Sequence, residues 1–472
     1  MARPAWRFRC VSCRGVLHRE RNSLVCRRCE TAYPVVAGVP LLVREPHTYL
    51  RSSFAQLRAA RERLEHRAAH LDVCWRQGEL PTAGLERRHR VTAAALASLE
   101  AFERPFDSAE QHLGADDASA ACDSASPGWA AEALLPYLLR DWQCNRELRA
   151  ASDFVSAAID RHLPRRVEAS LVVAGCGAGG LLRHLAQGFS RAAGVDLSLP
   201  ILVAIRELFS GGKLALKIPV ASESGVRIAD VHFGPASEVN GRAIEIVAAD
   251  ACRMPFPSRR IDCVVTPFLL DVIGDPQKLA REIHRILSPE GVWLSYGPSN
   301  SFNSIWYFDA SESAAFLAAE GFTPVETTSH RTTHLDRREF DESASFEDHV
   351  CYLFVAHKSV TSVRRASARR RKRTPAIGDL VPAHNSGAAL VRRRALGASD
   401  DETIVLEQVS VNGLWESFQI TEAIAQALDL VDGRRTVREI AAKLKEVDPA
   451  IDQDDAIEAF GRFFDAGLIY PK

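Results

Sequence analysis

The sequence predicts an α/β protein with a Rossmann-like, mainly parallel sheet that carries helices on both faces. A small cysteine-rich unit precedes this sheet, and another folded unit follows it. Short apolar runs alternate with helical segments from residue 171 to residue 297, the pattern of a parallel sheet. Two Cys-x-x-Cys pairs stand near the start, and a helix capping box opens a segment near the end. We therefore expect consecutive regions at residues 1–46, 47–165, 166–358, 359–388 and 389–472.

Composition narrows the class of protein. Of the 472 residues, 46% are hydrophobic and 25% are charged, and the formal net charge of −1 gives no sign of a nucleic-acid or membrane partner. No run approaches the ~18 apolar residues of a membrane span, and the first residues lack the apolar core of a secretion signal. The eleven cysteines, four of them in two pairs, favour a reducing compartment. We therefore expect a cytoplasmic protein without membrane contact.

The cysteine-rich unit has the ligand spacing of a zinc ribbon, with Cys10 and Cys13 in one pair and Cys26 and Cys29 in the other. Four thiolates make a closed tetrahedral site, which is structural and not catalytic. A unit of this size builds little core, so the metal would fold it. Two roles stay open: support of a neighbouring domain, and recruitment of RNA or a protein substrate.

The next region, residues 49–162, has a helical pattern. Leu57, Arg61, Leu64 and Ala68 repeat at helical spacing and indicate an amphipathic helix. A loop rich in Ala, Ser and Asp is expected at residues 114–128, and helix returns after it. The region therefore predicts a helical cap ahead of the sheet.

The sheet region contains apolar runs with helical segments between several of them. The clearest helix starts at Asp275, which can cap it, and has Pro276 at the first helical position. Leu279, Ile283 and Leu287 then repeat at spacing four. The expected strands lie at residues 171–174, 191–196, 244–250, 262–266 and 291–296.

A glycine-rich turn follows the first of these strands. Gly175, Gly177 and Gly179 let the backbone approach a ligand closely, and Cys176 lies between them. Asp196 ends the second strand about 20 residues further on, where a carboxylate can accept hydrogen bonds from ribose hydroxyls. The pattern is typical of a nucleotide-binding turn.

Further residues at strand ends complete this predicted site. Asp250 ends the third strand and is placed to accept from an adenine amino group, with Ala251 beside it. Asp262 opens the fourth strand, where we expect it beside the reacting edge, and Thr266 closes that strand. The set favours S-adenosylmethionine as the cofactor. Two alternatives stay open: glycines that only make tight turns, and a dinucleotide site.

Residues 138–358 resemble the carnosine N-methyltransferase family. The likeness implies a class I methyltransferase fold, an S-adenosylmethionine cofactor and, as acceptor, an imidazole nitrogen of a histidine-containing dipeptide. The matching segments are Arg140-Asp141-Trp142, Val173 to Gly179, Asp196-Leu197-Ser198, an insertion at 217–242, Asp262 to Asp271, Gly291-Val292-Trp293, Gly297-Pro298 and Phe354 to Lys358.

The same resemblance implies two candidate catalytic residues. The acidic residue that corresponds to Asp271 lies in the family's acceptor pocket, and the family's tyrosines near the last strand make Tyr352 a second candidate. A carboxylate that holds one imidazole N–H fixes the tautomer and leaves the other nitrogen with a free lone pair. The alternatives are a capping or solvated carboxylate for Asp271 and a half-buried strand residue for Tyr352.

The flanking units carry resemblances of their own. Residues 32–42 resemble small zinc-ribbon proteins that activate methyltransferases in translation. Residues 418–469 resemble the PqqD-like domain, and the likeness implies a winged-helix-like unit that binds a leader peptide by adding it to an exposed strand edge. The alternative is a winged helix used for packing or dimerisation. Seven Arg or Lys residues between Arg364 and Arg373 indicate a solvated linker, with phosphate binding as the alternative.

Together these features predict an S-adenosylmethionine-dependent N-methyltransferase with a structural zinc ion. Its acceptor would be an imidazole or amine nitrogen of a histidine-containing small molecule, or of a precursor peptide bound by the C-terminal unit. A nucleic-acid partner is not expected, because the Asn/Asp-Pro-Pro-aromatic motif for planar amino groups is replaced by Asp262-Cys263-Val264-Val265. An RNA-modifying enzyme and a peptide-binding scaffold with a degenerate fold remain the alternatives.

Overall fold

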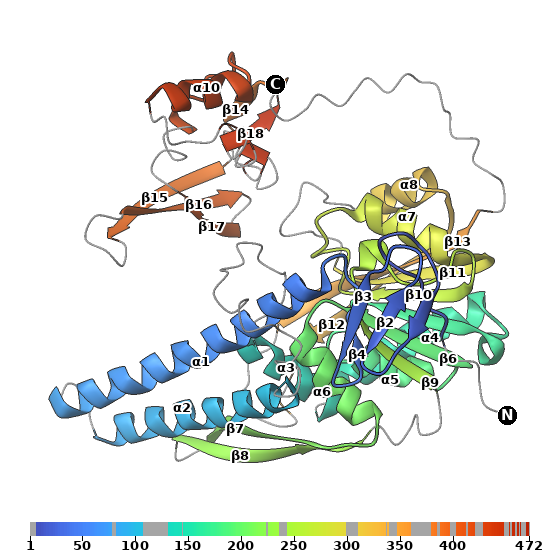
Figure 1. The fold of residues 1–472 in the computed structure, drawn as a ribbon, viewed down its shortest axis with the longest axis horizontal. Coiled ribbons are helices and arrows are strands. Elements are labelled where there is room, and N and C mark those ends of the chain that lie inside the picture. Colours follow the sequence, from blue (N-terminus) through green and yellow to red (C-terminus); the bar gives the residue numbers. More distant parts are fainter. Residues whose placement is uncertain are drawn as a thin grey trace. The chain divides into compact units, whose positions relative to one another are not determined.

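The chain forms two compact units in a computed structural model (Figure 1). The first comprises residues 1–270, 275–298 and 310–361, and the second holds the remaining residues. The expected loop at 114–128 and the basic run at 364–373 lie outside the described residues. The structure describes residues 6–77, 82–106, 131–143, 145–222, 225–235, 243–298, 310–336, 338, 347–359, 379–384, 388–396, 403–411, 414–420, 428–447, 453, 456–457, 460–461, 463 and 469–471.

A seven-stranded sheet organises the first unit, and it confirms the predicted parallel arrangement. Strand β13 pairs antiparallel with both of its neighbours, and the other pairings in the sheet are parallel. The five predicted apolar runs are strands β5, β6, β9, β10 and β11. In sheet order the strands are β12 (Phe322–His334), β13 (Glu347–Lys358), β11 (Leu287–Gly297), β10 (Ile261–Pro267), β5 (Ser170–Ala174), β6 (Arg191–Asp196) and β9 (Ala243–Ala248).

The strand order reverses beside β5. The chain leaves β5 toward β6 and β9 on one side, and it later returns to place β10 and β11 on the other. In open α/β sheets, ligands bind outside the carboxyl ends of the strands at such a switch point. The topology therefore places the glycine turn after β5 where a ligand is expected.

Helices cover both faces of the sheet. Helices α4 (Asn145–His162), α5 (Gly180–Ala186) and α6 (Leu199–Phe209) share one apolar core with the sheet. Helices α7 (Pro276–Ile286) and α8 (Ala310–Ala319) pack on β11, β12 and β13. The predicted cap of α7 is confirmed, because Asp275 Oδ1 accepts a hydrogen bond from Lys278 N at 2.9 Å.

A helical cap precedes the sheet, as expected. It contains α1 (Pro46–Gln77), α2 (Thr82–Glu103), the 3-10 turn η1 (Arg104–Phe106) and α3 (Ala131–Trp142). Helix α2 packs on a two-stranded hairpin, β7 (Leu214–Ser222) and β8 (Gly225–Phe233). The hairpin starts just before the insertion that the sequence places at residues 217–242. Among the helices that the structure describes, none is long and apolar enough to cross a membrane.

The N-terminal ribbon is an antiparallel sheet of β1 (Leu17–Arg19), β2 (Ser23–Cys26), β3 (Ala32–Val36) and β4 (Val39–Pro40). Its tail reaches the edge of the large sheet, where Leu41 forms a parallel bridge with Ala248 of β9. The crossover from β9 to β10 is also unusual, because it holds only the single 3-10 turn η6 (Ala251–Arg253) where a parallel crossover commonly has a helix. The ribbon packs beside this short crossover.

The second unit has a core of its own. It contains a three-stranded antiparallel sheet and α10, which opens with the predicted capping box: Glu439 Oε2 accepts from Thr436 N at 2.7 Å, and Thr436 Oγ1 accepts from Glu439 N at 3.3 Å. The likeness to a peptide-binding domain stays a prediction. The elements are β14 (Pro382–His384), β15 (Ala388–Leu396), β16 (Thr403–Val411), β17 (Leu414–Ile420), α10 (Val437–Val447) and β18 (Ile469–Pro471).

Candidate cofactor and metal sites

The glycine turn after β5 takes a backbone conformation that only glycine adopts easily. Gly175, Gly177 and Gly179 have φ angles of +74°, +48° and +82°. A side chain on Gly175 would meet Leu269, and one on Gly179 would meet Ile205. At Gly177 no atom lies within 4 Å of where a Cβ would stand, so the backbone there is open to a ligand.

The predicted ribose carboxylate lies against this turn. Asp196 Oδ2 accepts from Gly177 N at 2.9 Å, and Oδ1 accepts from Leu197 N at 2.8 Å and Ser198 N at 3.0 Å. A carboxylate has about four acceptor positions, so its oxygens keep capacity for a further donor. The structure therefore brings Asp196 and the glycine turn together in an arrangement that fits the ribose of S-adenosylmethionine.

Asp250 and Ala251 follow the neighbouring strand. Asp250 is exposed, and its Oδ1 accepts from Cys252 N at 2.8 Å, which caps η6. The backbone N–H of Ala249 donates to the carbonyl oxygen of Asp196 at 3.0 Å, so the two acidic residues end adjacent strands at the same edge. This placement fits the predicted adenine-binding role of Asp250.

Three other sequence-predicted residues take buried or structural positions. The Thr266 hydroxyl is fully buried and accepts from Trp293 Nε1 at 3.0 Å. Cys176 is buried, and this burial raises the pKa of its thiol. The expectation that Asp262 lies beside the reacting edge is wrong: it accepts from Ser170 N at 2.9 Å, at the amino ends of β10 and β5. The glycine turn follows the carboxyl end of β5, and in a parallel sheet the amino and carboxyl ends of the strands lie on opposite sides.

The two candidate acceptor residues belong to different parts of the chain: Asp271 follows β10, and Tyr352 lies on β13. Asp271 lies four residues after the end of β10 and is 9% exposed. Tyr352 lies on β13 opposite Gly297, the last residue of β11. Because Tyr296 pairs with Leu353 and successive side chains alternate between faces, Tyr352 points to the opposite face of the sheet from Tyr296.

The Arg-Asp-Trp segment of α3 holds the glycine turn in place. Asp141 Oδ2 accepts from Gly180 N at 2.9 Å, and Trp142 Nε1 donates to the carbonyl oxygen of Ala178 at 2.8 Å. Arg183 lies over the Trp142 ring at 4.5 Å and donates to the carbonyl oxygen of Asp141 at 3.0 Å. The segment therefore positions the turn from outside the sheet.

Sequence reasoning missed a cluster of aromatic and histidine side chains near the carboxyl ends of β10 and β11. Tyr296 Oη lies 3.3 Å from His330 Nδ1, and the His330 ring stacks on Phe154 at 5.0 Å. Phe268 packs edge-on against Tyr296 at 5.5 Å and contacts His334 at 5.5 Å. These residues come from α4, β11, β12 and the end of β10, so no local sequence pattern joins them.

A buried carboxylate adjoins this cluster. The Glu147 side chain is 4% exposed, and its Oε1 lies 3.8 Å from His334 Nδ1 and 3.7 Å from Arg140 Nη1. Glu147 Oε2 accepts from Asp336 N at 3.0 Å. Burial raises the pKa of Glu147 to about 7, although the charge of Arg140 opposes the shift. Glu147 is thus a carboxyl group that titrates near neutral pH beside aromatic rings.

The four ribbon cysteines converge on one point. Their Sγ atoms all lie within 4.8 Å of one another, with Cys10–Cys29 at 3.5 Å and Cys13–Cys26 at 3.4 Å. The two pairs sit in matching turns, in which Arg14 N donates to the carbonyl oxygen of Cys10 at 2.8 Å and Glu30 N to that of Cys26 at 2.7 Å. A tetrahedral ion at about 2.3 Å from each sulfur suits this arrangement.

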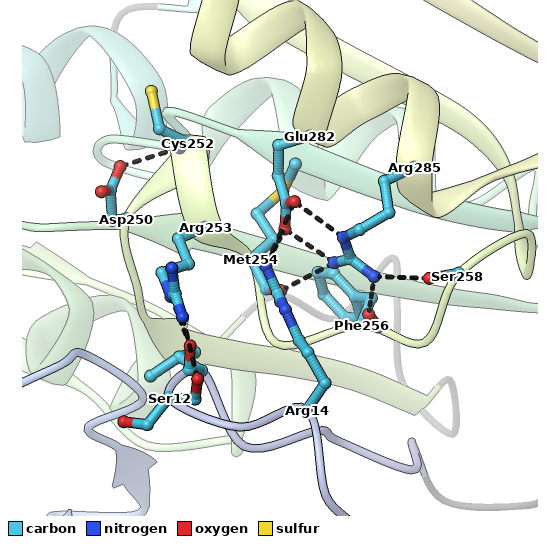
Figure 2. Close-up of polar contacts among 11 residues, drawn as sticks. Ser12, Arg14, Asp250, Cys252, Arg253, Met254, Phe256, Ser258, Glu282 and Arg285 are labelled. Carbon is cyan, nitrogen blue, oxygen red and sulfur yellow. Dashed lines mark hydrogen bonds and ion pairs between the residues drawn. The ribbon is translucent and has the colours of Figure 1, made fainter.

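The ribbon docks on the crossover after β9, and Figure 2 shows its polar contacts. Arg14 donates to the carbonyl oxygen of Met254 at 2.8 Å and pairs with Glu282 at 3.3 Å, while Arg285 pairs with the other side of Glu282 at 2.7 Å. Arg253 donates to the backbone carbonyl oxygens of Val11 and of Ser12. The ribbon and the residues after Asp250 therefore form one connected surface.

Comparison with known proteins identifies the central part of the chain. Residues 172–295 match the family model described as a methyltransferase domain, so this part of the chain is a methyltransferase domain. The match covers β5 to most of β11 and includes the glycine turn, Asp196 and Asp250. No curated protein matches the chain.

Solved structures of methyltransferases also align with this region. A Haemonchus contortus phosphoethanolamine N-methyltransferase in complex with S-adenosylmethionine is 20% identical, with a TM-score of 0.31 over 44% of this chain and 52% of that protein. An S-adenosylmethionine-dependent methyltransferase from Methanosarcina mazei is 13% identical, with a TM-score of 0.31 over 43% and 97%. A complex that contains the Haloferax volcanii Trm112 methyltransferase activator is 18% identical, with a TM-score of 0.29 over 45% of this chain and 97% of the matched chain. These scores are low, and the assignment rests on the family match.

Proposed function

We propose that the chain is an S-adenosylmethionine-dependent N-methyltransferase whose acceptor is an imidazole or amine nitrogen. The observation that carries the proposal is the Asp196 carboxylate, which accepts from Gly177 N of the glycine turn and from the backbone N–H groups of Leu197 and Ser198. The glycine turn, Asp196 and Asp250 would hold the cofactor, which supplies an activated methyl group on sulfur. The protein contributes binding, orientation and exclusion of water.

The acceptor site is proposed at the carboxyl ends of β10 and β11. Asp271 would hold one N–H of the acceptor ring and leave its other nitrogen free to attack. Tyr352, opposite the last residue of β11, is proposed as a second pocket residue. The partly buried ring of Phe268, which packs edge-on against the buried ring of Tyr296, supplies flat apolar surface near the strand ends and suits a planar or cationic acceptor.

The two flanking units are proposed to serve this reaction. The ribbon would bind one zinc ion through Cys10, Cys13, Cys26 and Cys29, and its fit is supported by the convergence of the four sulfur atoms. The C-terminal unit would capture a precursor peptide by strand addition, for which the three-stranded sheet β15–β16–β17 offers an edge. The acceptor would then be a histidine-containing peptide delivered by this unit, or a free small molecule.

Calorimetric titration with S-adenosylmethionine tests the proposal directly. We expect micromolar-range binding by the full chain, loss of about tenfold or more in affinity in Asp196→Ala, and no change in Asp153→Ala, which alters an exposed carboxylate on α4. Methyl transfer to β-alanyl-histidine and to histidine-containing peptides, followed by mass spectrometry, then identifies the acceptor. If the folded, zinc-loaded chain does not bind S-adenosylmethionine, the proposed enzymatic function is overturned, and a peptide-binding scaffold becomes the better account.

A further inference from the structure

A cavity of about 510 Å³ lies outside the carboxyl ends of β6 and β9. Its volume is within the ~300–1,000 Å³ of typical ligand sites. One wall comes from the methyltransferase domain, and the other comes from the segment that leads from the ribbon into the first turns of α1, which we call the junction (Leu42–Ser52). Lining residues include Leu197, Asp250 and Cys252 on the first wall and Val43, Thr48 and Tyr49 on the second.

The cavity continues the cofactor site. Leu197 follows Asp196 directly, and Asp196 contacts the glycine turn through Gly177. Asp250 lies just beyond the end of β9, the next strand, so a ligand that extends from the glycine turn past Asp196 next reaches this cavity. The cavity and the glycine turn therefore lie side by side, outside the carboxyl ends of neighbouring parallel strands.

Hydrogen bonds fix the junction to this edge at two points. Tyr49 Oη donates to the carbonyl oxygen of Leu197 at 2.7 Å, and Leu42 N donates to the carbonyl oxygen of Ala248 at 2.8 Å. Burial raises the pKa of Tyr49 well above its ordinary value, so the hydroxyl stays protonated as a donor. The second wall is thus held in place by the same strands that carry Asp196 and Asp250.

The chemistry of the walls suits a purine base. Val43 and Leu197 offer apolar surface to a flat ring, and the Asp250 carboxylate can accept from an exocyclic amino group. Thr48 lies on the second wall with its hydroxyl near Arg51, at 3.3 Å from Nη2. The chain segment that closes the cavity lies outside residues 172–295, the part that matches the methyltransferase family model.

We infer that the junction Leu42–Ser52 forms the outer wall of the adenine subsite, with Thr48 as a residue that determines which bases fit. The inference rests on the proposed cofactor. It assigns cofactor contacts to a segment that joins the ribbon to the helical cap, and it makes the size of the side chain at position 48 a limit on the bound base.

Binding measurements on matched variants test this wall. Thr48→Trp places a large ring in the cavity, whereas Ala55→Trp places the same ring on an exposed position of α1. For S-adenosylhomocysteine and for adenosine, we expect Thr48→Trp to weaken binding about tenfold or more, and Ala55→Trp to bind as the unchanged chain does. Circular dichroism melts confirm that both variants fold.

Photolabelling of the unchanged chain gives an answer that does not depend on any variant. A photoreactive azido-adenine analogue of S-adenosylhomocysteine should label the tryptic peptide from Glu45 to Arg51, and excess S-adenosylhomocysteine should prevent the label. Normal affinity in Thr48→Trp, or labelling confined to other peptides, would overturn the inference and leave the cofactor proposal intact. If the unchanged chain does not bind S-adenosylhomocysteine at all, the proposed function and the inference both fail.

Discussion

At the residue scale, the environment of Glu147 separates it from the surface carboxylates of the chain. Its side chain is almost fully buried. It faces Arg140 of α3, His334 at the end of β12, and the backbone N–H of Asp336 just beyond that strand. The carboxylates of Asp141 and Asp336 are also nearby. Burial favours the neutral form, and Arg140 only partly compensates. The charge state of Glu147 therefore changes in the range where methyl transfer would take place.

We predict that Glu147 makes stability depend on pH. Its pKa rises from an ordinary value of 4.5 to about 7 on folding, so the folded state binds more protons between these values. The free energy of unfolding should then fall as pH rises from about 4.5 to about 7, and it should level off above. Urea titrations at several pH values check this.

Glu147→Gln should remove this part of the pH dependence, because the amide does not titrate. Glu290→Gln, at an exposed position of β11, serves as the control and should keep the wild-type slope. Equal slopes in the two variants would show that the carboxyl of Glu147 does not titrate in this range.

The sequence predicted some of these residues and not others for a physical reason. Asp196 and Asp250 were found because each lies at or just beyond the carboxyl end of a strand, so their positions depend on local chain direction alone. Asp262 was misplaced, because a residue at the start of a strand lies at the far edge of a parallel sheet. Glu147 and His334 meet only through packing of α4 on β12, which no sequence spacing records.

At the scale of elements, the glycine turn offers a comparison between two glycines. Gly177→Ala should cost about 1–2 kcal/mol of stability from the left-handed backbone alone, and it should sharply reduce affinity for S-adenosylhomocysteine because the methyl group enters the open space. Gly179→Ala should destabilise more, because its Cβ also meets Ile205 and Phe209 at 3.2 Å. Denaturant titration and calorimetry measure both effects. Unchanged affinity in Gly177→Ala would contradict a ligand at this turn.

The ribbon should depend on its metal, and its contacts should transmit that dependence. We predict that Cys29→Ser lowers bound zinc, measured by elemental analysis, and that Cys252→Ser keeps it. Loss of the metal should also lower the Tm of the methyltransferase domain, because Arg14 would no longer bind Glu282 and Met254. A normal Tm in the metal-free protein would show that the docked surface contributes little to stability.

The strands and α7 were predicted from local patterns that the structure confirms, since periodicity and capping act within a few residues. The four ribbon cysteines converge in space, and the zinc ion that they would bind stays a prediction. The short crossover at η6 and the ribbon packed beside it were not predicted. Both depend on which surfaces meet after folding, for example Trp6 and Phe8 against Phe256 at 5.2 and 5.9 Å. The junction wall was missed for the same reason.

At the scale of the whole molecule, removal of the C-terminal region would separate the two proposed tasks, methyl transfer and peptide capture. A chain that ends at residue 361 should keep the affinity of the full chain for S-adenosylhomocysteine, because Asp196, Asp250 and the junction all lie in the first unit. If the C-terminal unit delivers peptides, this shortened chain should methylate free β-alanyl-histidine as before and lose activity on the precursor peptide. Equal loss on both acceptors, measured by mass spectrometry, would argue against delivery.

The bridge between Leu41 and Ala248 has a consequence for solubility. Strand β9 is the last strand of the large sheet, and the ribbon tail occupies part of its outer edge through Leu41 and Leu42. An uncovered edge strand presents unpaired N–H and C=O groups to any other chain, and proteins commonly shield such edges. Expression of the sheet region without residues 1–45 would uncover β9, and such a fragment would pair edge to edge and aggregate.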